Sequence, residues 1–133
     1  MQYWLIKSEP STWSWQQQLA APQKTTHWNG VNNALALRHM RLMKKGDLAF
    51  FYHSNDGKCI VGIAEITGEF ENEPNTKSGW VFVKAKDPLK QSVTLAQIKA
   101  NPKLKDMVLV NNSRLSVQPV AREEWDEINR MAQ

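Results

Sequence analysis

The stretch DLAFFYHSNDGKCIVGIAEITGEF, residues 47–70, is the clearest indication of how this chain folds. Residues 47–54 are rich in aromatic side chains, which favour β-strands, and Asn55-Asp56-Gly57 is a typical turn sequence. Residues 59–70 alternate apolar and polar side chains over their second half, as a half-buried strand does. The stretch therefore predicts a β-hairpin.

Segments on both sides of the hairpin predict further strands and short helices. Residues 3–7 and 79–85 are β-rich, and Ser11 is the expected N-cap of a helix carrying Trp13 and Trp15. These two tryptophans are two positions apart and cannot both face one surface of a helix squarely, so we expect one to be exposed. Further helices are predicted at 33–43, 94–100 and 122–131, with short apolar runs at 107–110 and 115–117. Short strands with few helices indicate an α+β fold with a small barrel-like sheet.

Length and composition set the class of protein. The chain has 133 residues, of which 41% are hydrophobic and 23% charged, as in ordinary globular proteins. We expect one domain over residues 1–133. No apolar run approaches the length of a membrane span, the start MQYWLIKSEP is too polar for a signal peptide, and one cysteine fits a reducing compartment. The expectation is a cytoplasmic protein without a membrane partner, most simply a monomer.

Positive charge gathers in the first half of the chain. Residues 1–64 hold seven Lys/Arg against three acids, whereas residues 65–133 hold ten of each. Such a field suits a polyanion, because neutralising phosphates supplies much of nucleic-acid affinity. A solvated basic face without a partner is an equally good interpretation of charge alone. If a nucleic acid binds, the expected contacts to its backbone are Lys7, Arg38, Arg41, Lys44 and Lys45.

The chemistry of metal sites and of common enzymes is missing. His27, His39 and His53 stand apart and there is one cysteine, so neither a metal nor another cofactor is predicted. The neighbouring pairs His53–Ser54 and Ser8–Glu9 point to opposite faces of a strand and are not aligned for catalysis. We therefore expect no catalytic residues.

The segment HWNGVNN, residues 27–33, combines a large aromatic with a turn sequence. Tryptophan belongs in cores or on binding surfaces, whereas Asn-Gly belongs at an exposed turn. Asparagine amides and the bare backbone of glycine supply donors and acceptors. Trp28 is therefore interpreted either as one wall of a ligand site or as a core residue that anchors the turn.

Eight short motifs, in this order along the chain, resemble the EVE domain family. They are YWLIKSEP (3–10), WNGVNN (28–33), MKKGD (43–47), FFYHS (50–54), GIAEI (62–66), GWVFV (79–83), RLSVQPV (114–120) and EEW (123–125). The resemblance covers the chain essentially from end to end. One position departs from the family pattern, because Asn32 stands where arginine is usual, so a contact of that arginine is lost or changed.

The resemblance implies a PUA-like fold, a small mixed β-barrel with surrounding short helices. The fold is related in plan to the YTH readers of methylated adenine in RNA and to the SET- and RING-associated readers of methylated cytosine in DNA. It also implies a non-enzymatic module that holds a modified base of DNA or RNA, such as methylated or hydroxymethylated cytosine, in an aromatic pocket. Trp28 and Asn29 are the first expected ligand contacts, and the others are Ser8, Glu9, Gly30, Val31, Asn33, Tyr52, His53, Ser54 and Ser116.

Other functions remain open at this point. The chain is also compatible with a protein that binds tRNA or another RNA, or with a small enzyme that uses Glu9 or His53 as acid or base on modified nucleosides. A third alternative is a protein-interaction module whose aromatic surface binds a partner chain.

Overall fold

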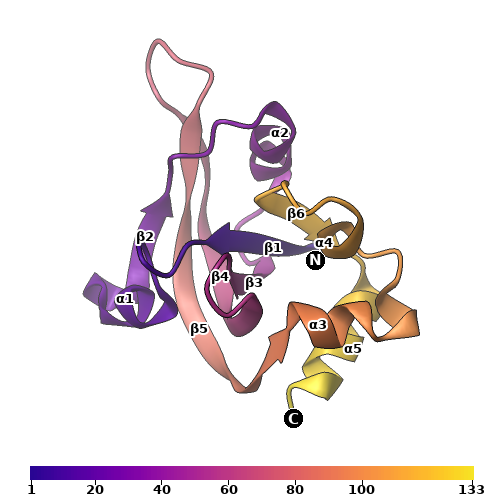
Figure 1. Ribbon diagram of the computed structural model, residues 1–133. Coiled ribbons are helices and arrows are strands. Elements are labelled where there is room, and N and C mark those ends of the chain that lie inside the picture. The colour runs from indigo at the N-terminus through magenta and orange to yellow at the C-terminus, as the bar shows by residue number, and fades with distance from the viewer.

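The computed structural model describes residues 1–133 and contains a six-stranded mixed sheet with short helices around it (Figure 1). The strand order is β2-β5-β4-β3-β1-β6, in which β1 and β3 are parallel and all other neighbours are antiparallel. The strands are β1 (Tyr3–Ser8), β2 (Thr25–Trp28), β3 (Leu48–His53), β4 (Cys59–Asn72), β5 (Gly79–Thr94) and β6 (Val117–Val120). The expected α+β class is confirmed. The sheet is not closed by hydrogen bonds between β2 and β6, so a barrel is not confirmed.

Five short α-helices connect and flank the strands. They are α1 (Trp15–Ala20), α2 (Ala34–Leu42), α3 (Leu95–Lys99), α4 (Val108–Asn111) and α5 (Arg122–Met131), with 3₁₀ turns at Pro22–Lys24 and Pro102–Leu104. None of the helices is long and apolar enough to cross a membrane.

The predicted hairpin is confirmed as β3 and β4. Ala49 pairs with Ala64, and the register shifts between Phe51 and Tyr52, which marks an irregularity near the turn. Beyond the sheet, β4 and β5 continue together as a long two-stranded ribbon (Figure 1). The hairpin therefore forms the centre of the sheet, and its outer strand carries the ribbon.

The predicted helix at Ser11 begins later than expected. Ser14 is the N-cap of α1: its hydroxyl accepts from Gln17 N at 3.1 Å, and Gln17 Oε1 accepts from Ser14 N at 2.8 Å. This capping box satisfies two otherwise orphaned donors, which Ser11 does not do. Trp13 consequently lies outside the helix, in the turn that follows β1.

Side chains of β1 and β3 alternate between two cores. Ile6 and Phe51 belong to one core, and Leu5 and Phe50 belong to the other. The first core contains Trp15, Trp28 and the buried face of α2. The second core contains Trp125 of α5, whose ring stacks on Phe50 with a centroid distance of 3.9 Å. Any residue near the end of β1 or β3 therefore faces one core or the other, never both.

Candidate nucleic-acid interface

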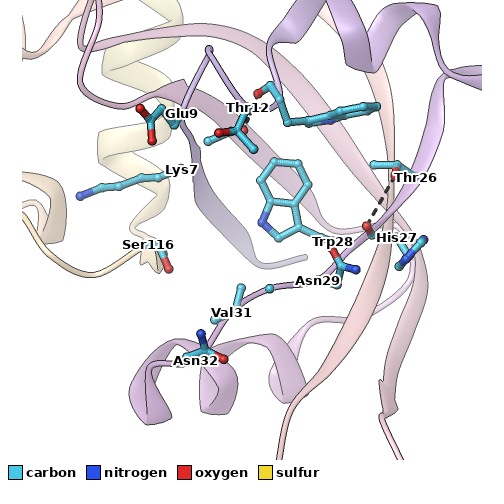
Figure 2. A pocket seen from close by; sticks show the side chains of 13 residues that line it. Lys7, Glu9, Thr12, Thr26, His27, Trp28, Asn29, Val31, Asn32 and Ser116 are labelled. Atoms are coloured by element: carbon cyan, nitrogen blue, oxygen red, sulfur yellow. Dashed lines mark hydrogen bonds between the residues drawn. The ribbon is translucent and has the colours of Figure 1, made fainter.

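A cavity of about 610 Å³ opens where β1 and β2 end (Figure 2). Its size falls in the range of small-molecule pockets. Four chain segments meet there: the end of β1 with the turn after it, the end of β2, the loop between β2 and α2, and the segment before β6. The lining residues are Lys7, Ser8, Glu9, Thr12, Trp13, Thr26, His27, Trp28, Asn29, Gly30, Val31, Asn32 and Ser116.

Trp28 is both a core residue and a wall of this cavity. It is the last residue of β2, where it pairs with Val81, and only 8% of it is exposed. Its ring meets Phe51 edge-on at a centroid distance of 5.5 Å, and Phe51 meets Trp15 in the same way at 5.1 Å. The ring nitrogen of Trp28 donates to no protein atom and lies on the side of the ring nearer Ser116 (Figure 2). The two interpretations of Trp28 are therefore compatible: packing fixes a ring that also lines a cavity.

Trp13 is a second aromatic wall that the sequence interpretation did not select. It lines the same cavity, and its Nε1 donates to Gln18 Oε1 at 2.8 Å. Its backbone N donates to Glu9 O at 2.8 Å, and the Ser8 hydroxyl donates to Trp13 O. The available signal was the Trp13–Trp15 spacing, which indicated that one of the two faces outward.

The loop from Asn29 to Asn32 presents polar groups with no partner in the protein. The side chains of Asn29 and Asn32 are exposed and make no hydrogen bond. Gly30 has a φ of +76°, a conformation that favours glycine, while no heavy atom lies within 4 Å of where its Cβ would be. Ser78 Oγ holds the loop by donating to Val31 O at 3.1 Å. The turn thus gives the backbone at Gly30 its positive φ, and no other group of the protein covers this backbone.

Several predicted site residues are not brought to this cavity. Asn33 is the N-cap of α2, where its amide oxygen accepts from Ala36 N at 3.0 Å. Tyr52 pairs in register with Lys7 and packs in the second core, on the opposite face of the sheet from Trp28. His53 Nε2 accepts from Trp15 N at 3.0 Å, and Ser54 lies in a second, smaller cavity with Tyr52. Tyr52 therefore does not line this cavity, and the second aromatic side chain that lines it with Trp28 is Trp13.

The predicted backbone contacts are spread over the surface rather than gathered at the cavity. Lys7 alone among them lines it, whereas Arg38 is exposed on α2 and Arg41 is tied to the ribbon by a 2.8 Å bond to Lys77 O. Lys44 and Lys45 follow the end of α2, about 15 Å along the helix axis from its start. The order of these charges along the chain did not reveal that the helix begins at the cavity and runs away from it.

The hydrogen bond between His53 and the backbone of Trp15 depends on pH. Burial lowers the pKa of His53 below the ordinary value of 6.5, so the folded protein favours the neutral ring that accepts from Trp15 N. Because the folded pKa is depressed, the contribution to stability is present above pH 6.5 and is lost as the pH falls through the folded value. The pKa of His39 is also lowered, by burial and by Arg38, and acts in the same direction.

We expect the melting temperature to fall as the pH is lowered from 7 towards 5, with a shallower fall in His53→Gln. The glutamine retains an acceptor oxygen for Trp15 N but does not titrate in this range. Thermal unfolding followed by circular dichroism at several pH values measures the difference. Identical pH profiles for the two proteins would exclude a contribution from His53.

No group of three or more His, Cys, Asp or Glu side chains is arranged to hold a metal ion. Apart from Glu9 at its edge, the cavity holds no carboxylate, and it contains no histidine other than the exposed His27. The arrangement combines aromatic walls with hydrogen-bonding groups and a single positive charge, which suits binding of a flat, polar ring.

Comparisons with known proteins agree with this fold. The sequence matches the EVE domain family over residues 2–131. Human thymocyte nuclear protein 1 is 35% identical over an alignment 159 positions long, which covers 93% of this chain and 71% of the human protein. The family match over nearly the whole chain and the identity to the human protein define the class of this protein. The chain belongs to the EVE domain family.

Two solved structures extend the comparison to three dimensions. A crystal structure of a protein from Agrobacterium tumefaciens superposes with a TM-score of 0.96 at 45% identity, covering 99% of this chain and 93% of that one. Human THYN1, crystallised in complex with 5-methylcytosine-containing DNA, superposes with a TM-score of 0.94 at 32% identity, covering 100% of this chain and 98% of that one. The fold of this chain is therefore shared with a protein that has been captured on modified DNA.

Proposed function

We propose that this protein is a non-enzymatic nucleic-acid binding module that holds a modified base, such as a methylated or hydroxymethylated cytosine, in the cavity lined by Trp13 and Trp28. The observation that carries the proposal is that two indole rings and several unpartnered polar groups line one open cavity of about 610 Å³. The complex of human THYN1 with 5-methylcytosine-containing DNA supports it from a relative.

The physical requirements of base recognition match the residues present. A protein that reads all edges of one base needs that base extruded from the duplex or already single-stranded. Stacking on an aromatic ring stabilises such a base by roughly 1–3 kcal/mol. Trp28 is suited to this role because its packing against Phe51 fixes the ring before a ligand arrives. A wall that needs no reordering loses little entropy on binding.

Polar groups around the rings supply the recognition of edges. Asn29 and Asn32 each offer both a donor and an acceptor, and the Trp28 ring nitrogen offers a donor. The carboxylate of Glu9 is exposed at the cavity and accepts only from Ser11 Oγ, at 3.0 Å. A carboxylate accepts from the exocyclic amine of cytosine or adenine. The set is thus complementary to a base that carries an amine beside a ring acceptor.

The proposal is tested by fluorescence anisotropy with short labelled oligonucleotides of DNA and RNA, single- and double-stranded. Each is compared bare and with 5-methylcytosine, 5-hydroxymethylcytosine or N6-methyladenine. We expect one modified base to be preferred by about tenfold, equivalent to about 1.4 kcal/mol. Equal, weak binding to every oligonucleotide would contradict the proposal and leave the basic surface as the only source of affinity.

Asn29→Ala should lower affinity for the preferred oligonucleotide by about fivefold, the effect of one lost hydrogen bond of about 1 kcal/mol. Its amide makes no bond within the protein, so folding should be unaffected. Gln16→Ala is the matched control, because it removes an exposed amide from α1 outside the cavity. If both variants bind like the unaltered protein, Asn29 does not contact the base.

A further inference from the structure

A second cavity of about 210 Å³ lies on the opposite face of β1 and β3 from Trp28. Its polar lining combines two ammonium groups with three hydroxyls and one amide. Two lysines, Lys7 and Lys58, line it together with Tyr52, Ser54 and Asn55. Leucines of α3 and α4 form the apolar part of the wall.

The hydroxyl of Tyr52 is a donor without a partner in the protein. Only 3% of Tyr52 is exposed, and its hydroxyl makes no hydrogen bond, although the residue lines this cavity. Burial raises its pKa, so the hydroxyl keeps its proton and remains a donor. The Tyr52 hydroxyl thus remains accessible at a cavity that the residue lines, with its hydrogen-bonding capacity unused, so it can donate to an acceptor bound there.

The charges around the cavity favour an anion. The ammonium of Lys7 lies 5.8 Å from the centroid of the Tyr52 ring and donates to Ser113 O at 2.7 Å, which leaves two of its protons free. Lys58 is exposed and is the residue directly before β4. Neither lysine forms an ion pair, and no carboxylate lines the cavity. Two ammonium groups and a phenol hydroxyl around a space of this size match a phosphate group.

Lys7 connects the two cavities because it lines both. Figure 2 shows its side chain extending away from Trp28, so the ammonium lies on the far side of the first cavity. Tyr52 is the register partner of Lys7 on the adjacent parallel strand, and Ser54 N donates to Ser8 O at 2.9 Å, which fixes the two strand ends together. The two cavities therefore lie on either side of one strand end, with a lysine passing between them.

We propose that the second cavity binds a backbone phosphate of the nucleic-acid strand whose base occupies the first cavity. This inference rests on the proposed function and adds a distinct contact to it. The phosphate accepts from the Tyr52 hydroxyl and from the ammonium groups of Lys7 and Lys58. It contributes to affinity and to its salt dependence without reading the base, since phosphate contacts position a strand and base contacts specify it.

The test measures binding of modified and unmodified oligonucleotides to Tyr52→Phe and Lys58→Gln over a series of salt concentrations. Tyr52→Phe removes one oxygen from a buried ring and retains its shape. Lys86→Gln is the matched control for charge, because Lys86 is exposed on β5, lines neither cavity and is not among the expected contacts to the nucleic-acid backbone. A second arm replaces each phosphate flanking the modified base, one at a time, by an uncharged methylphosphonate.

We expect Tyr52→Phe and Lys58→Gln each to weaken binding about three- to tenfold while the ratio between modified and unmodified oligonucleotides stays unchanged. Lys58→Gln should also lower the slope of the logarithm of affinity against the logarithm of salt concentration by about one. One methylphosphonate position should weaken binding to the unaltered protein by a larger factor than binding to Tyr52→Phe, which has already lost one of the contacts to that phosphate. If the protein prefers the modified base but both variants bind no more weakly than Lys86→Gln, the phosphate site alone is overturned.

The remaining outcomes separate this inference from the proposed function. Loss of affinity in both variants without any base preference would retain the phosphate site and overturn the base pocket. Titration of inorganic phosphate that depends on Tyr52, with no effect of any methylphosphonate, would mean that the cavity takes free phosphate, which overturns the strand contact. Absence of oligonucleotide binding even at low salt would overturn both proposals.

Discussion

Asp47→Ala is expected to lower the free energy of unfolding by about 3 kcal/mol, a large share of the stability of a small domain. Asp47 is 4% exposed and forms no ion pair. Its carboxylate accepts instead from three N–H groups: Trp4 Nε1 at 3.0 Å, Lys44 N at 2.9 Å and Gln2 N at 3.2 Å. Removing it leaves all three donors without an acceptor.

The position of these donors explains why the loss is large. Trp4 lies in the middle of the first core, Lys44 follows α2, and Gln2 precedes β1. One carboxylate thus joins the sheet, the helix end and the N-terminal strand. A buried donor that loses its partner costs about 1–3 kcal/mol, although donors near the surface recover part of this through water.

Urea denaturation of Asp47→Ala, Asp47→Asn and Asp56→Ala measures the effect. Asp47→Asn keeps one acceptor oxygen but turns an amide group towards a donor, so its loss should be intermediate. Asp56 is exposed in the turn between β3 and β4, and its alanine variant should change stability by less than about 0.5 kcal/mol. An Asp47→Ala protein as stable as Asp56→Ala would show that the three bonds contribute nothing.

The parts of the fold that local sequence determines were predictable. The hairpin of β3 and β4 carries its own turn, and α3 carries a capping box between Thr94 and Gln97. The second half of β5 was missed because Asp87-Pro88 and a run of exposed polar residues do not resemble a strand. That segment is held by pairing with β4, in a register that shifts on either side of Pro88, which the local pattern does not encode.

β2 was missed for a related reason. It has four residues, lies at the edge of the sheet and pairs only with β5. The prediction placed Trp28 on a turn, and the structure places it at the last position of this strand, directly before the Asn29-Gly30 turn. The sheet therefore holds the ring of Trp28 in place. The local sequence did not predict this, because it depends on the long-range pairing of Trp28 with Val81.

The candidate site was predictable where it is contiguous in sequence and not where it depends on strand faces. Asn29, Gly30 and Val31 lie beside Trp28 in the cavity, as their neighbourhood in the chain suggested. Tyr52 was grouped with His53 although adjacent strand residues face opposite sides, which is the argument already applied to His53 and Ser54. The alternation in FFYHS separates Tyr52 from Phe51 and His53, and the structure adds that Phe51 lies on the same face as Trp28.

Trp28→Leu is expected to abolish the preference for a modified base and to lower the free energy of unfolding by about 2 kcal/mol. The first effect follows from losing a stacking surface, and the second from shrinking a side chain that is 8% exposed and packed against Phe51. Because both effects come from one ring, loss of binding in this variant alone does not distinguish a ligand wall from a residue needed for folding.

Phe50→Leu supplies the control that separates them. Phe50 is fully buried in the second core and stacks on Trp125, so its replacement should cost a similar amount of stability without touching the cavity. Both variants are compared well below their melting temperatures, by anisotropy with modified and unmodified oligonucleotides. Retained preference in Phe50→Leu and lost preference in Trp28→Leu assigns the effect to stacking. Equal loss in both would show that base preference depends on overall stability, and Trp28 would then be a core residue only.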